Sequence, residues 1–159
     1  MTSAYALYQD VTDQVYLRLI NDLVDNEDWF GLVWQDSLAF DRSARAVFPR
    51  LKPYRLSHTR THRWPGTQGQ MATVTTYRAT SRIIDFLLQP ARLFGWQCPK
   101  YPEDLFFGSD TDGLALATVA HDDSGWLFRK RYASIIGPAA LNNEEALTRR
   151  ECKFFEWPV

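Results

Sequence analysis

Near the start of the chain, apolar residues recur at helical spacing. The apolar positions are Val15, Tyr16, Leu19, Ile20, Leu23 and Val24. The polar positions of the other face are Asp13, Arg18, Asn21 and Asp22. Side chains three and four positions apart share one face of an α-helix. The pattern therefore predicts an amphipathic helix over residues 10–25 that covers a core.

Two shorter elements are predicted next. Residues 30–35 form an almost continuous apolar run, which is typical of a buried strand. Residues 42–51 favour a short helix, and Asp41 is its expected N-cap because a carboxylate accepts hydrogen bonds from free backbone N–H groups. Pro49 and Pro53 limit the length of this helix.

Residues 54–64 alternate with the period of a β-strand. One set of alternate positions is Tyr54, Leu56, His58, Arg60, His62 and Trp64. The other set is Arg55, Ser57, Thr59, Thr61 and Arg63. A turn-prone segment at 65–69 and a second β-rich run at 71–78 follow, which together predict a hairpin with a longer loop. Because both strands are polar, we expect them to be exposed on one face or to lie near a sheet edge.

The middle of the chain predicts a helix that a proline interrupts. Thr80 or Ser81 is the expected cap, and the apolar positions that follow are Ile83, Ile84, Leu87 and Leu88. Pro90 cannot occupy a regular helix interior, so the helix should kink or restart before residues 93–96. Residues 97–104, with Pro99 and Pro102, predict an irregular connection.

The last third gives the clearest β signal. Three β-rich runs, at 105–107, 114–121 and 126–132, are separated by Asp- and Gly-bearing turns at 109–113 and 122–125. This order predicts an antiparallel meander. Asn142, followed three residues later by Glu145, resembles a capping box and predicts a short helix through Arg150.

These elements predict a single α+β domain over residues 1–159. We expect a mostly antiparallel sheet of about six strands, in which the C-terminal meander and the polar hairpin are packed by three to four helices. A chain of 159 residues with 45% hydrophobic and 14% aromatic residues supplies a core of the size that one domain needs.

Charge is divided unevenly along the chain. There are 18 Lys and Arg against 19 Asp and Glu, for a net charge of −1. Between Asp41 and Asp85, however, no acidic residue occurs. The basic residues there are Arg42, Arg45, Arg50, Lys52, Arg55, Arg60, Arg63, Arg78 and Arg82. Such asymmetry indicates a charged partner or ligand.

The polar hairpin is the predicted binding surface. Its candidate binding residues are Arg55, His58, Arg60, His62, Arg63, Trp64 and Arg78. Guanidinium and hydroxyl groups suit phosphate, nucleic-acid backbone or an acidic protein, and aromatic rings next to them can stack on bases. The alternative is neutralisation inside the fold by acids of the first helix or by Glu103 and Asp104.

Histidines and acidic pairs are the other candidates for chemistry. His58 and His62 would lie about 13 Å apart on a strand, too far to share a metal ion. His121 is either a base oriented by an acid or the residue that closes a strand, and the second interpretation is favoured. The pairs Glu103–Asp104 and Glu144–Glu145 have no identifiable partner in the sequence.

No sequence motif specifies a reaction. A nucleophile elbow, a phosphate-binding glycine loop and a dinucleotide fingerprint are all missing, and the turn at 109–113 lacks the later ligands of a calcium loop. We therefore expect no cofactor and no bound metal. The segment from Pro102 to His121 resembles small stand-alone bacterial proteins in a general way, and no residue role follows from this resemblance.

The remaining predictions concern the cellular compartment of the protein. Two cysteines, Cys98 and Cys152, do not form a disulfide framework, and neither a secretory signal nor a membrane-spanning run is present. These features predict a cytoplasmic protein with reduced thiols.

The leading functional hypothesis is a non-catalytic regulatory protein that binds another protein, for example a toxin-neutralising protein. One alternative is nucleic-acid binding by the hairpin over residues 54–78, and another is a small enzyme with a site near His121. Oligomeric state does not follow from the sequence.

Overall fold

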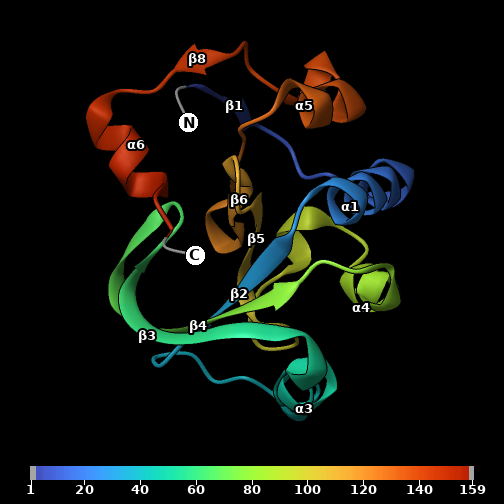
Figure 1. Cartoon of the computed structure of the whole chain (residues 1–159), viewed down its shortest axis with the longest axis vertical. Coiled ribbons are helices and arrows are strands. Elements are labelled where there is room, and N and C mark those ends of the chain that lie inside the picture. Colours follow the sequence, from blue (N-terminus) through green and yellow to red (C-terminus); the bar gives the residue numbers. More distant parts are fainter. Residues whose placement is uncertain (1–2, 158–159) are drawn as a thin grey trace.

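The computed structural model describes residues 3–157 and contains one eight-stranded antiparallel sheet (Figure 1). The strand order across the sheet is β3-β4-β2-β5-β6-β7-β1-β8. The strands are β1 (Ser3–Leu7), β2 (Trp29–Gln35), β3 (Arg55–Trp64), β4 (Thr67–Arg78), β5 (Glu103–Ser109), β6 (Gly113–Val119), β7 (Ser124–Leu127) and β8 (Glu145–Ala146). The long hairpin β3–β4 therefore forms one end of the sheet, and β3 is its edge strand.

Helices lie on both faces of this sheet. The α-helices are α1 (Asp13–Asn26), α2 (Arg42–Arg45), α3 (Val47–Leu51), α4 (Ile84–Leu87), α5 (Lys130–Ile136) and α6 (Arg149–Phe155). Short 3₁₀ turns connect them: η1 (Lys52–Tyr54), η2 (Ser81–Ile83), η3 (Leu93–Gly95), η4 (Ala120–Asp122) and η5 (Pro138–Ala140). In Figure 1, α1, α4 and α5 lie on one side of the sheet, and α6 lies on the other.

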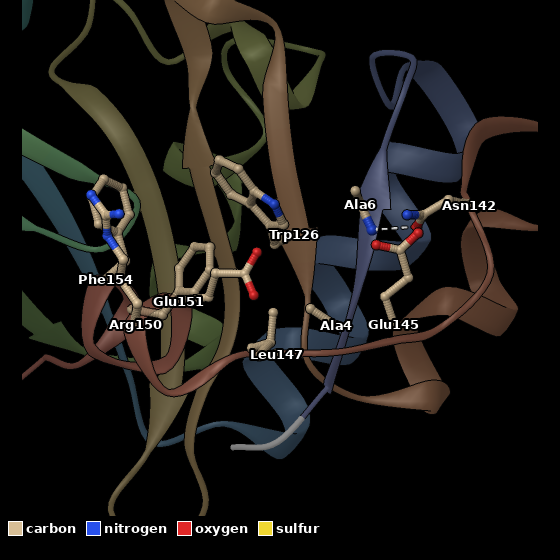
Figure 2. Close-up of a pocket in the computed structure, with 10 residues that line it drawn as sticks. Ala4, Ala6, Trp126, Asn142, Glu145, Leu147, Arg150, Glu151 and Phe154 are labelled. Atoms are coloured by element: carbon tan, nitrogen blue, oxygen red, sulfur yellow. Dashed lines mark hydrogen bonds between the residues drawn. The ribbon is translucent and has the colours of Figure 1, made fainter.

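The face under α6 has an aromatic core of its own. Phe155 of α6 packs with the buried side chains Trp29, Val33, Trp64, Ala72, Val74, Phe106, Leu114 and Ala117. The tip of the β3–β4 hairpin curls toward α6, where the backbone N–H of Gly66 donates to the carbonyl of Phe154. On the other side of α6, next to β1 and β7, a pocket remains open (Figure 2).

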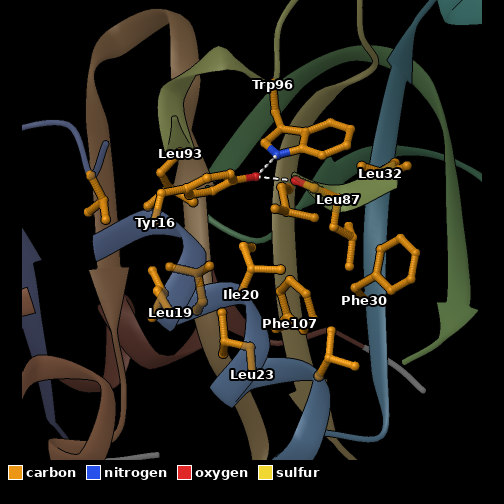
Figure 3. Packing of buried hydrophobic residues seen from close by; sticks show 14 of the residues in the cluster. Tyr16, Leu19, Ile20, Leu23, Phe30, Leu32, Leu87, Leu93, Trp96 and Phe107 are labelled. Atoms are coloured by element: carbon orange, nitrogen blue, oxygen red, sulfur yellow. Dashed lines mark hydrogen bonds between the residues drawn. The ribbon is translucent and has the colours of Figure 1, made fainter. Parts of the chain in front are cut away.

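The larger core fills the space between the sheet and α1, α4 and α5 (Figure 3). Leu19, Ile20 and Leu23 of α1 are fully buried there, as the helical spacing predicts. The buried hydroxyl of Tyr16 forms two hydrogen bonds within this core. It donates to the carbonyl of Leu87 and accepts from the indole N–H of Trp96 at 3.0 Å. Burial raises the pKa of Tyr16, so the hydroxyl remains a neutral donor and acceptor.

The predicted fold class is confirmed: this is an α+β domain with an antiparallel sheet. The first helix, the strand after it and the β5–β6–β7 meander all form. Asp41 caps α2 as predicted and accepts from the N–H of Ala44 at 3.0 Å. The sheet has eight strands and not the six expected, because the short strands β1 and β8 at its far end were not predicted.

Two details of the hairpin differ from the prediction. The connection is a tight turn at Pro65 and Gly66, where Gly66 has a φ of +80°, and not a loop of five residues. β4 lies between β3 and β2, and the segment Val74–Tyr77 is buried. The threonines of β4 therefore form part of an interior strand, although the expectation of an edge position is correct for β3.

The C-terminal third also needs two corrections. The predicted strand at 126–132 ends at Leu127, and α5 begins at Lys130. The expected helix from Asn142 to Arg150 is wrong, because residues 145–146 form β8. The helix begins later, at Arg149, where Thr148 and Glu151 form a capping box with both reciprocal hydrogen bonds.

Among residues 3–157, no helix combines the length and the apolar character needed to cross a bilayer.

Candidate functional site

Most of the predicted binding residues are exposed on the hairpin. Arg55, His58, Arg60, His62 and Arg63 of β3 and Arg78 of β4 all reach solvent. Trp64 does not: it is 1% exposed, and its indole N–H donates to Asp104 Oδ2 at 2.9 Å. The expectation that Trp64 stacks on a ligand at the surface is therefore wrong.

The pairing of β3 with β4 is irregular at two places, and only the first puts an extra residue into β3. The register with β4 shifts between Arg55 and Ser57 and again between Thr61 and Arg63. Because a bulge moves the following side chains to the other face, Arg55 does not share a face with Ser57 as predicted. At the second shift the extra residues lie in β4, and Trp64 beyond it is buried in the core under α6, whereas His58 and Arg60 are exposed.

Two basic residues of the hairpin are neutralised within the fold. Arg60 makes a bidentate ion pair with Asp36, at 2.6 and 2.7 Å. Arg63 lies 3.7 Å from Glu156 and donates to the carbonyl of Lys153. Internal neutralisation thus applies to these two residues, but the acids involved are not the ones that the sequence suggested.

The other seven basic residues between Asp41 and Asp85 have no carboxylate within ion-pair distance among residues 3–157. We call this set the basic edge: Arg42, Arg45, Arg50, Lys52, Arg55, Arg78 and Arg82. These residues come from α2, α3, η1, the start of β3, the end of β4 and η2. Arg55 lies opposite Tyr77 in the sheet, next to Arg78, and Arg50 lies 5.3 Å above the ring of Phe86 in α4. Segments far apart in the sequence are thereby brought to one end of the hairpin.

Acidic side chains lie beside this set at three places. Asp41 precedes Arg42 and caps α2, and Asp85 is exposed on α4. Arg78 lines a pocket of about 370 Å³ together with Asp28 and Asp110. The positive charge of the basic edge is therefore most isolated around η1 and the first residue of β3, where Lys52 and Arg55 lie.

A second cluster of titratable groups lies elsewhere, between the start of β5 and η4. We call it the acid–histidine cluster: Glu103, Asp104 and His121. His121 Nδ1 lies 3.3 Å from Glu103 Oε2, and one potential ligand atom from each residue lies within 4.8 Å of the others. Asp104 has a φ of +53°, a conformation that L-residues rarely adopt. Both carboxylates are almost fully buried, whereas the side chain of His121 is 47% exposed.

This cluster shows where the sequence analysis was incomplete. The Glu103–Asp104 pair was expected to have no partner, but β5–β6 pairing places His121 beside it. Asp122, the neighbour of His121 in sequence, is farther away, with 3.9 Å between His121 Nε2 and Asp122 Oδ1. The sequence feature that points to this cluster is a pair of acidic residues directly before a wholly apolar run, which is an unusual position for charged side chains.

Hydrogen bonds satisfy every carboxylate oxygen of the cluster. Asp104 accepts from the Trp64 indole and from the backbone N–H of Ala120, at 2.9 and 3.0 Å. Glu103 accepts from the backbone N–H of Cys98 at 2.8 Å through one oxygen and faces His121 with the other. Three side chains could each offer one ligand atom to a metal ion, but the protein alone already completes the network. A structural role therefore accounts for the geometry.

The protonation of the cluster follows from burial and neighbouring charge. Burial raises the pKa of Asp104 to about 6, although the hydrogen bonds from Trp64 and Ala120 act in the opposite direction. Burial by itself would lower the pKa of His121, but the hydrogen bond to Glu103 and the nearby carboxylates outweigh it and raise that pKa. Asp104 therefore changes charge in the mildly acidic range, and His121 stays protonated to a higher pH than an ordinary histidine does.

A further buried carboxylate, Glu27, is compensated by different groups. It accepts from the Tyr132 hydroxyl at 2.5 Å and from Arg129 at 2.8 Å. Burial raises the pKa of Glu27 above its ordinary value, against the effects of Tyr132 and Arg129. This network ties the end of α1 to α5.

Comparisons with known proteins give no relative: no family model, curated protein or solved structure matches this chain.

Proposed function

We propose that this protein is a non-catalytic binding protein that recognises an acidic surface of another protein through the basic edge. The observation that carries the proposal is the set of seven basic side chains without an ion-pair partner among residues 3–157. Exposed charges of one sign attract a partner of opposite sign and fix its orientation. The unpaired edge of β3 lies beside them and offers backbone hydrogen-bonding groups to the same partner.

A protein partner agrees better with the composition of this surface than a nucleic acid does. Base stacking needs exposed aromatic rings, and Trp64 is buried. The large apolar side chains exposed on the hairpin are Leu56 and Met71, which are 50% and 40% exposed. Aliphatic side chains next to arginines are common in protein interfaces.

The surroundings of His121 favour binding over catalysis. Among residues 3–157, its ring nitrogens lie within ion-pair distance of the carboxylates of Glu103 and Asp122, and no hydroxyl or thiol nucleophile is hydrogen-bonded to it. Nucleophilic catalysis needs such a group next to the base. A regulatory or toxin-neutralising role requires surface complementarity and no chemistry, so it fits this arrangement.

The decisive test combines affinity capture with a neutralised surface. The bait would carry Arg42→Gln, Lys52→Gln and Arg55→Gln, three exposed residues whose side chains make no hydrogen bond or ion pair within residues 3–157. We expect the wild-type chain to retain an acidic protein from an extract of its source, and this variant to lose at least about tenfold in affinity. Binding of the wild type should weaken steeply as salt rises.

A matched control removes the same number of charges elsewhere. Arg18→Gln, Lys130→Gln and Arg149→Gln lie on α1, α5 and α6, and none of them belongs to the basic edge. This control should bind as the wild type does. Equal losses in both variants would show that net charge alone acts, and removal of the captured material by nuclease would show that the partner is a nucleic acid. Either result would overturn the proposal.

A further inference from the structure

The pocket beside α6 is a separate feature from the basic edge. We call it the α6 pocket; it has a volume of about 320 Å³ and lies between the sheet and the last helix (Figure 2). Its lining residues come from β1, β7, β8 and α6 and from the segments that join them: Ala4, Ala6, Trp126, Asn142, Glu145, Leu147, Arg150, Glu151, Phe154 and Phe155. A cavity of this size matches a small ligand or a single large side chain.

The walls of the α6 pocket are aromatic and aliphatic. Trp126 is only partly buried, and its ring centre lies 5.0 Å from that of Phe155. Phe154 is 44% exposed, and Leu147 completes the apolar wall. Such walls accept an apolar stem, and the face of an indole also attracts a cation.

Two carboxylates face this apolar wall. In Figure 2, Glu151 reaches in from α6, with Trp126 above its carboxylate and Leu147 below it, and Glu145 lies on the opposite side next to Asn142. One oxygen of Glu151 accepts from the N–H of Thr148 at 2.7 Å. Hydrogen bonds from the backbone and side chain of Thr148 lower the pKa of Glu151, so this carboxyl is ionised at neutral pH.

The pocket carries more negative than positive charge. Its one basic residue, Arg150, is not within ion-pair distance of Glu145 or Glu151, and neither carboxylate has another cationic partner among residues 3–157. Two acids against one base leave an excess of one negative charge beside an indole face.

From this arrangement we infer that the α6 pocket binds an organic cation: an apolar stem that ends in an ammonium or guanidinium group. The stem packs on Trp126, Leu147 and Phe154, and the charged head lies between Glu145 and Glu151. Charge-assisted hydrogen bonds to carboxylates and contact with an aromatic face both favour such a head group. A free amine and a basic side chain of a protein both have this chemistry.

A titration with small probes tests the inference. The probes are 2-phenylethylammonium, its neutral analogue 2-phenylethanol and the anion 3-phenylpropionate, followed through the NMR signal of the Trp126 indole N–H. Loss of one indole signal in Trp126→Phe identifies that signal. We expect saturable binding of the cation with a dissociation constant on the order of 1 mM, and at least about fivefold weaker binding of the other two.

Charge variants on the pocket have matched controls in the same segment. Glu145→Gln should weaken binding of the cation at least about fivefold, whereas Glu144→Gln, next to it but outside the pocket, should not. Glu151→Gln should weaken it similarly and keep the helix intact, because glutamine also serves in a capping box. Arg150→Gln should strengthen binding about two- to threefold, and Arg149→Gln should have less effect.

The source of the cation is decided by a fourth probe, Nα-acetyl-lysine methylamide, which presents a lysine side chain as a protein would. Tighter binding of this probe indicates a partner protein, and tighter binding of phenylethylammonium indicates a free amine. Three results would overturn the inference. They are equal affinity for the cationic and the neutral probe, an equal effect of Glu144→Gln and Glu145→Gln, and an indole signal that does not shift at about ten times the expected dissociation constant. None of these outcomes depends on the basic edge.

Discussion

The two main groups of charged residues in this protein are treated in opposite ways by the fold. In the acid–histidine cluster, Glu103 and Asp104 are buried, and each of their four oxygens has a hydrogen-bond donor. In the basic edge, residues such as Arg42 and Arg55 are exposed and have no carboxylate partner among residues 3–157.

This comparison distinguishes charged groups that stabilise the fold from charged groups that are available to bind a partner. A buried carboxylate without donors would cost the full loss of its hydration, so the protein must satisfy it internally. An exposed guanidinium keeps its hydration, so the fold gains little by pairing it. Substitutions in the first group should therefore alter stability, and substitutions in the second should alter binding.

The largest effect is expected from Trp64, which links the hairpin to the acid–histidine cluster. Trp64→Ala removes a large buried side chain and one donor to Asp104, so the free energy of unfolding should fall by about 3–5 kcal/mol. Urea denaturation at neutral pH measures this loss.

The exposed residue Arg55, at the other end of the same strand, provides the comparison. Arg55→Ala should change the free energy of unfolding by no more than about 0.5 kcal/mol. If the two variants lost similar amounts of stability, the proposed separation between structural and available charges would be wrong.

The second prediction concerns how stability depends on pH. The pKa of Asp104 is about 6 in the folded protein, against 3.8 for an unperturbed carboxyl, so folding favours the protonated form. The stabilisation that this group contributes is present below pH 4 and is lost as pH rises to about 6, to the extent of about 3 kcal/mol. Asp104→Asn cannot ionise, so the wild type should lose stability relative to this variant over that range. Urea denaturation at pH 4, 5, 6 and 7 measures this change, and a constant difference would contradict it.

His121 adds to the pH dependence of the free energy of unfolding at higher pH. Its folded pKa is raised, so its stabilising contribution is complete below the unfolded value of 6.5 and is lost as pH rises through the folded value. The difference in unfolding free energy between wild type and His121→Gln should therefore shrink above pH 6.5. The same denaturation series, extended to pH 8.5, measures it.

The smallest effect is expected for the exposed ion pair between Arg60 and Asp36. Arg60→Gln should lower the melting temperature slightly at low ionic strength. The difference should vanish in about 0.5 M salt, because interactions between exposed charges are largely screened at that ionic strength. Arg42→Gln should show no difference at either salt concentration, since Arg42 has no such partner among residues 3–157. A loss for Arg60→Gln that persists in high salt would show that the pair contributes through packing instead.

Local pattern predicted the main elements well where one periodicity dominated. The spacing of Leu19, Ile20 and Leu23 predicted α1, and the capping preference of Asp41 predicted the start of α2. The prediction failed where two elements compete at short range, as at residues 126–132, where β7 gives way to α5 after two positions. It also failed for the short strands β1 and β8 at the far end of the sheet, because a strand of two to five residues gains its stability from its neighbours and not from its own sequence.

The candidate sites were predictable only in part, because they depend on contacts between distant segments. The hairpin was identified from its charges, but the partners Asp36 of Arg60 and Glu156 of Arg63 could not be inferred from spacing. The acid–histidine cluster joins residues 18 positions apart, and a left-handed Asp104 is needed to form it. No local pattern specifies that conformation.

The sequence by itself determined the α+β class, the polar edge hairpin and the uneven distribution of charge, because these follow from side-chain periodicity and composition within short segments. Only the tertiary structure decided which charges are neutralised, where Trp64 points and that α6 leaves a pocket beside β1 and β7. These outcomes depend on strand order, on two register shifts between β3 and β4 and on the packing of the last helix. Each brings together groups that are far apart in the chain, and pairwise distances between such groups are set by the whole fold.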